Sequence, residues 1–210
     1  MPIVVTGATG HLGRLVVQEL LARGVPASDV VATGRAIDKI KDLADRGVQT
    51  RAIDYEEPDT LRRAFAGANK VLLISGSDVG KRVAQHANAI VAAASAGVGL
   101  LVYTSIAYAD RSTISIAEDH RASEQALATA DVPVTVLRNS WYLENYTGQI
   151  PGYLEHGAIL GSADDGRVSA ATRADYAAAA AAVLTSEGHA GRTYELGGDT
   201  AFSMLDRSPP

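Results

Sequence analysis

A short apolar run followed by three glycines stands near the N-terminus, where the chain reads Ile3-Val4-Val5-Thr6-Gly7-Ala8-Thr9-Gly10-His11-Leu12-Gly13. The first four residues are typical of a strand, and apolar residues at helical spacing follow Gly10. Glycine is needed where the backbone turns tightly, or where a side chain would keep a pyrophosphate away from it. The amides at the start of the following helix then point at the phosphates, and the helix dipole adds to the attraction. Strand, G-x-x-G-x-x-G and helix in this order therefore predict a dinucleotide-binding loop rather than a glycine turn without a ligand.

Beyond this loop, short apolar runs alternate with stretches of helical spacing. The runs rich in β-branched residues predict strands at Ile3–Thr6, Asp29–Thr33, Val48–Ile53, Lys70–Ser75, Leu100–Ser105, Val134–Leu137 and Arg192–Leu196. Several of them are apolar throughout, which is typical of a parallel sheet covered on both faces. We therefore predict an α/β fold with a doubly wound parallel sheet, the NAD(P)-binding Rossmann fold, in a single domain of residues 1–210.

Helices are predicted between these strands. Apolar spacing, proline and glycine mark three of them, at Leu12–Leu20 before Gly24, from Pro58 to Gly67, and at Val79–Ala96 before Gly97. Thr172 and Asp175 resemble a capping box. The low-complexity run Ala177–Ala182 is therefore predicted to be a close-packed helix rather than a flexible tract.

The composition excludes several classes of protein. The chain has 210 residues, is 47% hydrophobic and 20% charged, and carries a net charge of -5 with scattered basic residues. We therefore expect no nucleic acid as a main partner. The absence of cysteine excludes disulfides, thiolate metal sites and cysteine nucleophiles. No metal is predicted, because no ligand spacing links the five histidines, which are His11, His86, His120, His156 and His189. With no secretory signal and no apolar stretch of about 20 residues, we predict a cytoplasmic protein without a membrane partner.

The end of the second predicted strand indicates which dinucleotide is bound. NAD-specific folds carry Asp or Glu there for the ribose hydroxyls, whereas this chain has Arg35, with Lys39 one helical turn later. A guanidinium pairs with a 2′-phosphate that a carboxylate would repel, so we predict NADP(H) as the cofactor. The alternative is that both cations only solvate a helix N-terminus, where the dipole disfavours them. Asp54, after the third strand, is placed to accept from the adenine amino group or to cap the turn before Pro58.

Polar residues at the carboxyl ends of the later strands are candidates for the reacting end of the site. They are Ser75-Gly76, Tyr103-Thr104-Ser105 and Arg138-Asn139-Ser140-Trp141-Tyr142. A Tyr-x-x-x-Lys motif, in which the lysine lowers the pKa of a tyrosine that protonates an alkoxide, does not occur; Lys81 is the last lysine of the chain. The ordinary apparatus of a carbonyl reductase is therefore absent.

Several motifs together resemble the NmrA-like atypical short-chain dehydrogenases/reductases, and most closely their bacterial NAD(P)H:quinone oxidoreductase branch. The motifs are V-V-T-G-A-T-G-H-L-G from residue 4, L-L-I-S-G at 72–76, V-Y-T-S at 102–105, E-D-H-R-A-S-E at 118–124 and L-R-N-S-W-Y-L-E-N at 137–145. The similarity runs from Met1 to about Phe202 with the motifs in the expected order. It implies that NADPH reduces a quinone or a related small electron acceptor, with Ser75, Thr104, His120 and Asn139 near the nicotinamide.

Quinone chemistry agrees with the missing Tyr–Lys pair. Hydride delivered to a ketone makes a strongly basic alkoxide, whereas hydride delivered to a quinone makes a delocalised anion that water or a weak acid protonates. Proximity and alignment are then the main requirements. His120, with a reference pKa of about 6.5, could orient or protonate the product; the alternative is an exposed helix residue. Asn139 binds the nicotinamide carboxamide or a quinone oxygen, or is a turn residue, and Trp141 and Tyr142 wall a pocket or belong to the core.

Two sets of site residues follow from the loop, the strand ends and the resemblance. Those predicted to bind NADP(H) are Thr6, Gly7, Gly10, His11, Leu12, Gly13, Arg35, Lys39, Asp54 and Ser75. Those predicted to take part in catalysis are His120, Asn139 and Thr104.

The C-terminal part departs from the family pattern. Relatives of this kind continue with further helix beyond the strand that Leu196-Gly197-Gly198 closes, whereas this chain ends with Met204 to Pro210. We expect residues from about 140 to 210 to contribute a small, incomplete substrate lobe, with cofactor binding retained. Two other functions stay open: a non-enzymatic NADP(H)-sensing regulator, and a reductase or isomerase of another small molecule. A homodimer is compatible with the fold by analogy only.

Overall fold

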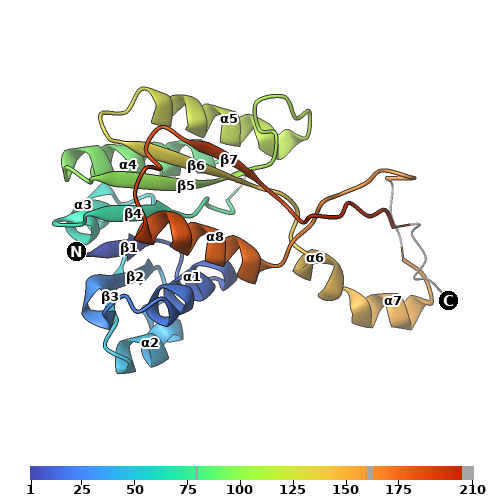
Figure 1. The fold of residues 1–210 in the computed structure, drawn as a ribbon, viewed down its shortest axis with the longest axis horizontal. Coiled ribbons are helices and arrows are strands. Elements are labelled where there is room, and N and C mark those ends of the chain that lie inside the picture. The colour runs from blue at the N-terminus through green and yellow to red at the C-terminus, as the bar shows by residue number, and fades with distance from the viewer. Residues whose placement is uncertain (79, 160–162, 205–210) are drawn as a thin grey trace.

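The computed structural model describes residues 1–78, 80–159 and 163–204. Within them, seven strands form one parallel sheet in the order β3-β2-β1-β4-β5-β6-β7 (Figure 1). The strands are β1 (Ile3–Val5), β2 (Val30–Gly34), β3 (Gln49–Ala52), β4 (Lys70–Leu73), β5 (Leu100–Ile106), β6 (Val134–Asn139) and β7 (Thr193–Leu196). The order reverses between β1 and β4, which is the point where doubly wound sheets bind their ligands. The predicted Rossmann-type fold is confirmed.

Helices cover both faces of this sheet (Figure 1). The helical elements are α1 (His11–Ala22), η1 (Ala27–Asp29), η2 (Ile37–Ile40), α2 (Lys41–Asp45), α3 (Pro58–Phe65), α4 (Arg82–Ser95), α5 (Ser115–Ala128), α6 (Glu144–Thr147), α7 (Ile150–His156) and α8 (Arg173–Thr185). Helices α1 and α8 pack together on one face, and α3, α4 and α5 follow one another along the other. The helix that begins at His11 starts inside the glycine motif, as predicted.

Alternate residues of the inner strands supply the two cores. Ile3 and Val5 of β1 join the core under α1 and α8, whereas Val4 joins the core under α3 and α4. Strands β1, β2 and β4 are buried along their whole length. Their continuous apolar runs therefore reflect a sheet with no solvent-facing side, as the sequence predicts.

Two strands end two residues away from their predicted ends, whereas the ends of β1, β2, β3 and β5 differ by one residue. β4 stops at Leu73, because residues 74–76 leave the ladder to bond with side chains, so the expected extension to Ser75 is wrong. β6 continues to Asn139, two residues beyond the expected end at Leu137, because β5 and β7 pair with it on both sides. Helix α4 begins at Arg82; the predicted start at Val79 lies outside the described residues. The capping box of Thr172 and Asp175 on α8 is confirmed.

The last third of the chain divides between the sheet and a projecting lobe. Helix α8 and strand β7 belong to the Rossmann core, because α8 packs on α1 and β7 pairs with β6. Helices α6 and α7 instead extend away from the sheet (Figure 1). One isolated bridge pairs Tyr142, before α6, with Ala171, after α7, and a second pairs Val168 with Phe202. Among the described residues, no helix combines the length and the apolar character needed to cross a membrane.

Candidate functional site

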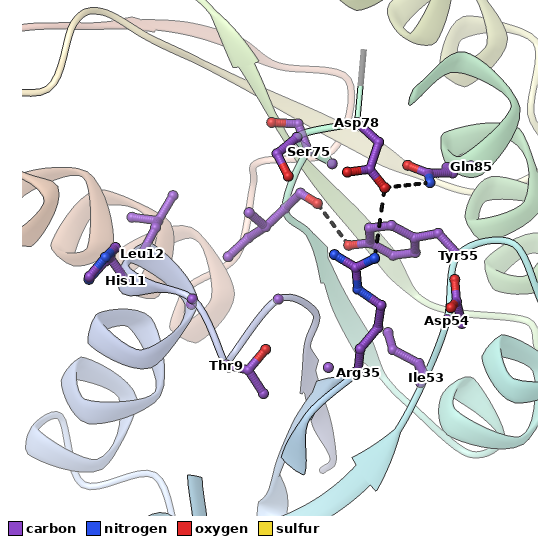
Figure 2. A pocket seen from close by; sticks show the side chains of 17 residues that line it. Thr9, His11, Leu12, Arg35, Ile53, Asp54, Tyr55, Ser75, Asp78 and Gln85 are labelled. Atoms are coloured by element: carbon purple, nitrogen blue, oxygen red, sulfur yellow. Dashed lines mark hydrogen bonds and ion pairs between the residues drawn. The ribbon is translucent and has the colours of Figure 1, made fainter. Parts of the chain in front are cut away.

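A pocket of about 270 Å³ opens at the carboxyl ends of β1 to β4, where the strand order reverses. Its walls come from the glycine loop, the end of β2, residues 53–55 after β3, residues 74–78 after β4, and Gln85 of α4 (Figure 2). Because a doubly wound sheet binds its ligands at this point, the pocket is the candidate cofactor site.

The glycine loop brings the start of α1 against this pocket. Gly7 adopts a left-handed backbone with a φ of 62°, and the Gly10 amide donates to the Gly7 carbonyl at 2.9 Å. A Cβ on Gly13 would lie 2.6 Å from the carbonyl carbon of Gly7 and 2.8 Å from the Cα of Ala8, so only glycine lets α1 approach the loop this closely. No side chain at Gly10 caps α1. The first amides of the helix are therefore free of a capping side chain and suit an anion.

Most of the cofactor residues predicted in the loop line the pocket, namely Gly7, Gly10, His11, Leu12 and Gly13. Thr6 is placed differently. It is fully buried, and its Oγ1 accepts hydrogen bonds from the Tyr55 hydroxyl at 2.6 Å and from the Ile74 amide at 2.9 Å. Thr6 thus ties the end of β1 to the neighbouring wall and is not one of the residues that line the pocket.

The two predicted phosphate-binding cations lie in different places. Arg35 lines the pocket, and its Nη1 lies 3.8 Å from Oδ2 of Asp78 (Figure 2). Lys39 lies on the turn η2, where its side chain is exposed and does not line the pocket. The turn buries Ile40 in the core and leaves Lys39 on the outer surface. The structure therefore brings Arg35 to the site, but not Lys39.

Asp54 lines the pocket and also caps a turn. Its Oδ1 accepts from the Glu56 amide at 2.9 Å, and its own amide hydrogen-bonds to Oγ1 of Thr60 at 3.0 Å. The turn-capping alternative is confirmed, and the carboxylate still lies beside the pocket.

Residues 74–76 form a wall that buried side chains hold from behind. The Ser75 amide donates to Oγ1 of Thr104 at 3.0 Å. The Gly76 amide donates to Nε2 of His86 at 3.0 Å, and the Gly76 carbonyl accepts from Nε of Arg82 at 2.6 Å. Thr104, His86 and Arg82 are all buried, and Ser75 itself lines the pocket as predicted. The backbone of this wall is therefore fixed in position before any ligand binds.

His86 is held as a neutral imidazole. Its Nε2 accepts from the Gly76 amide, so the proton is assigned to Nδ1, which lies 2.7 Å from Oγ of Ser123. Burial lowers the pKa of His86 to about 3, with smaller contributions from His120 and from the positive charge of Arg82. The ring is therefore uncharged at neutral pH, as its role as an acceptor requires.

His120 lies deeper than expected. It is 2% exposed on α5, so its interpretation as an exposed helix residue is wrong. Its Nδ1 lies 2.8 Å from the hydroxyl of Tyr103, which also lies 3.3 Å from Nδ1 of His86. Burial, followed by the charge of Arg82, lowers the pKa of His120 to about 4. His120 thus stands behind the wall of residues 74–76 and does not line the pocket.

Asn139 is the last residue of β6 and not a turn residue. Its side chain is 5% exposed, and within the described part of the chain its Oδ1 has no hydrogen-bond partner. An amide oxygen buried without a donor costs about 1–3 kcal/mol. Like Thr104 and His120, Asn139 lies outside the pocket walls.

The two aromatic residues that follow β6 differ from one another. Tyr142 packs on the core and meets Tyr176 edge to face, with ring centroids 5.3 Å apart, while Arg173 lies over its ring at 4.7 Å. Trp141 is 50% exposed. The alternative that places both residues in the core is therefore confirmed for Tyr142 and wrong for Trp141.

Several residues of the pocket are not among those predicted to bind NADP(H) or to act in catalysis, although Thr9, Ile74 and Gly76 lie within motifs of the sequence. They are Thr9, Gly34, Ile53, Tyr55, Ile74, Gly76, Ser77, Asp78 and Gln85. Ser77 and Asp78 directly continue the strand end at Ser75-Gly76, so this continuation was the available signal. Tyr55 and Gln85 reach the pocket from a loop and a helix whose sequence patterns give no indication of a site.

Known proteins resemble this chain over nearly its whole length. The family model described as NAD(P)H-binding matches residues 7–187. Quinone oxidoreductase 2 of Escherichia coli is 47% identical over 202 residues, which are 96% of this chain and 70% of that protein.

Solved structures agree with this similarity. An NADPH-dependent quinone oxidoreductase of Escherichia coli complexed with NADPH superposes with a TM-score of 0.92 at 47% identity, covering 96% of this chain and 71% of that one. The triphenylmethane reductase of Citrobacter sp. complexed with NADP(H) superposes with a TM-score of 0.91 at 43% identity, covering 96% and 72%. The glycine loop, its pocket and these similarities lead to one conclusion: the chain belongs to the NAD(P)H-binding, NmrA-like family.

Proposed function

We propose that this protein is an NADPH-dependent oxidoreductase that reduces a quinone or a related small electron acceptor by hydride transfer. The observation that carries the proposal is the pocket at the reversal of strand order, which is lined both by the glycine loop packed around Gly13 and by Arg35. The quinone and dye reductases that share 43–47% identity with this chain support the choice of acceptor.

The pocket residues suit the parts of NADPH. The uncapped first amides of α1 and the glycine loop would hold the pyrophosphate, and Arg35 would pair with the 2′-phosphate. Ser75 and the wall after β4 would continue toward the nicotinamide. When bound, NADPH supplies the hydride. The missing side chain at Gly13 and the missing cap at Gly10 are the features that fit the dinucleotide.

The protein's own contribution is position rather than acid catalysis. Thr6, Thr104, His86 and Arg82 fix the backbone of residues 74–76, which favours alignment of a cofactor and an acceptor. Burial raises the pKa of Tyr103 and lowers that of His120, so neither group changes charge near neutral pH. A quinone suits such a site, because water is a sufficient acid for its reduced anion.

We propose that Asn139 takes part through its unpartnered oxygen. A buried Oδ1 without a donor is suited to accept from an amide or hydroxyl group of a ligand that reaches the end of β6. In the same proposal, His120 and Thr104 act from behind the wall, and the lobe of α6 and α7 bounds the acceptor. Residues from about 140 onward would thus contribute to both the core and the substrate side.

The test combines turnover with binding. NADPH consumption is followed by absorbance with a panel of benzoquinones and naphthoquinones, and NADPH and NADH binding are measured by calorimetry. Arg35→Ala is expected to weaken the binding of NADPH by about 10- to 100-fold and the binding of NADH by less than about 3-fold, because only NADPH carries the 2′-phosphate.

Arg63→Ala, on an exposed position of α3, removes the same charge away from the pocket and is expected to change neither affinity. No NADPH oxidation with any quinone, by folded protein that binds NADPH, would favour the NADP(H)-sensing regulator instead. Equal losses of affinity for NADPH and NADH in Arg35→Ala would contradict the role assigned to Arg35.

A further inference from the structure

The charges around Arg35 do not all favour binding of the 2′-phosphate of NADPH. Among the described residues that line the pocket, Arg35 is accompanied by two carboxylates, Asp54 and Asp78, and by no lysine. A 2′-phosphate dianion therefore meets one cation and two anions at this end of the pocket. The charge at this end of the pocket therefore depends on the two carboxylates as well as on Arg35.

Asp78 is the carboxylate that faces Arg35. Its Oδ2 lies 3.8 Å from Nη1 of Arg35 and accepts a hydrogen bond from Nε2 of Gln85 at 3.2 Å (Figure 2). The Asp78 carbonyl accepts from the amides of Lys81 and Arg82 at 3.2 and 3.1 Å, at the start of α4. The backbone of Asp78 is therefore anchored to the start of α4, and Gln85 holds its carboxylate beside Arg35.

Two other charged groups nearby make contacts of their own. Nζ of Lys81 lies 2.8 Å from Oε1 of Glu56, so Lys81 pairs with Glu56, while the charges of Asp78 and Asp54 act on it at longer range. Asp54 uses its Oδ1 to cap its own turn. Arg35 and Asp78 thus form the pair at the pocket that the entry of a phosphate would have to rearrange.

We propose that Asp78 is a specificity-determining residue, which competes with the 2′-phosphate of NADPH for the guanidinium of Arg35 and so narrows the preference for NADPH over NADH. The inference rests on the proposed function, because it requires NADPH to bind in this pocket. NADH has a ribose hydroxyl in place of the phosphate, so its binding does not require Arg35 to leave Asp78. Both side chains are partly exposed, at 69% for Arg35 and 39% for Asp78, so the competition is modest and reversible.

The experiment measures dissociation constants for NADPH and NADH by calorimetry on the whole chain and on Asp78→Asn. The variant keeps the size of the side chain and removes its charge. NADPH is expected to bind about 3- to 10-fold more tightly, and NADH is expected to change by less than about 2-fold. Asp131→Asn is the matched control: it makes the same substitution at an exposed position that lines no part of the pocket, so both constants are expected to stay as in the unmodified chain.

A double variant separates competition from simple repulsion. In the Arg35→Ala background, Asp78→Asn is expected to lose most of its effect on NADPH, because the guanidinium for which Asp78 competes is gone. An undiminished effect in that background, weaker NADPH binding in Asp78→Asn, or an equal gain in Asp131→Asn would each overturn the inference. Failure of the unmodified chain to bind NADPH at all would instead refute the proposed function.

Discussion

Gly13 of α1 and Gly152 of α7 differ in how closely the rest of the chain packs against them. At Gly13, three backbone atoms of the glycine loop lie within 2.8 Å of the place that a Cβ would take, whereas nothing lies within 4 Å of that place at Gly152 in α7. The neighbouring leucines differ in the same sense: Leu20 of α1 is fully buried, and Leu154 of α7 is 78% exposed. The start of α1 at the cofactor pocket therefore depends on direct packing of backbone against backbone, whereas α7 in the projecting lobe has open space at Gly152 and an exposed side chain at Leu154.

The largest effect is expected when alanine replaces each of these two glycines. Gly13→Ala must push α1 away from the loop, because the atoms it meets are backbone atoms. We expect a loss of about 3 kcal/mol in the free energy of unfolding and at least tenfold weaker NADPH binding. Gly152→Ala is expected to gain about 0.5–1 kcal/mol, because glycine is a poor helix former. Urea denaturation and calorimetry measure both; similar changes at the two sites would contradict the comparison.

A second effect comes from the neutral histidines behind the pocket. The pKa of His86 is lowered to about 3 and that of His120 to about 4, mainly by burial, from an ordinary value of 6.5. Since the unfolded chain takes up protons at higher pH than the folded chain does, stability is full above about pH 6.5 and is lost as the pH falls toward these lowered values. Each group contributes a slope of up to about 1.4 kcal/mol per pH unit in this window.

Unfolding free energies between about pH 6.5 and pH 5 test this slope. His120→Gln is expected to reduce it by about half, because one of the two buried titrations is removed. His156→Gln, on the exposed end of α7, is the matched control and is expected to leave the slope as it is. An unchanged slope in His120→Gln would mean that the buried cluster opens to water before it titrates.

The smallest effect is expected on the surface of the lobe. Leu154→Ser removes an exposed apolar side chain and is expected to change the free energy of unfolding by less than about 0.5 kcal/mol. The dissociation constant of NADPH is expected to stay the same, because α7 does not line the cofactor pocket. A loss above about 2 kcal/mol would show that Leu154 is covered in solution, and the contrast between the two regions would then disappear.

Local patterns accounted for much of the fold. The apolar runs at β1, β2 and β4 predict buried parallel strands, and the pair Thr172 and Asp175 predicts the start of α8. The glycines of the loop could also be identified from the sequence, because the tight turn that requires them involves only a few consecutive residues. The ends of β4 and β6 were missed because side chains and neighbouring strands from distant segments decide where those ladders stop.

Residue types and their spacing along the chain were enough to predict the parallel sheet, the glycine loop and the cation at Arg35, because each of these features arises from neighbouring residues. The folded structure was needed to show that Asp78 faces Arg35 and that Lys39 lies outside the pocket. It was also needed to show that Thr6 and Thr104 hold the wall of residues 74–76. These outcomes depend on side chains from separate strands and helices reaching the same few ångströms of space. No spacing along the chain encodes such a meeting, because the sheet order that creates it places β1 beside β4.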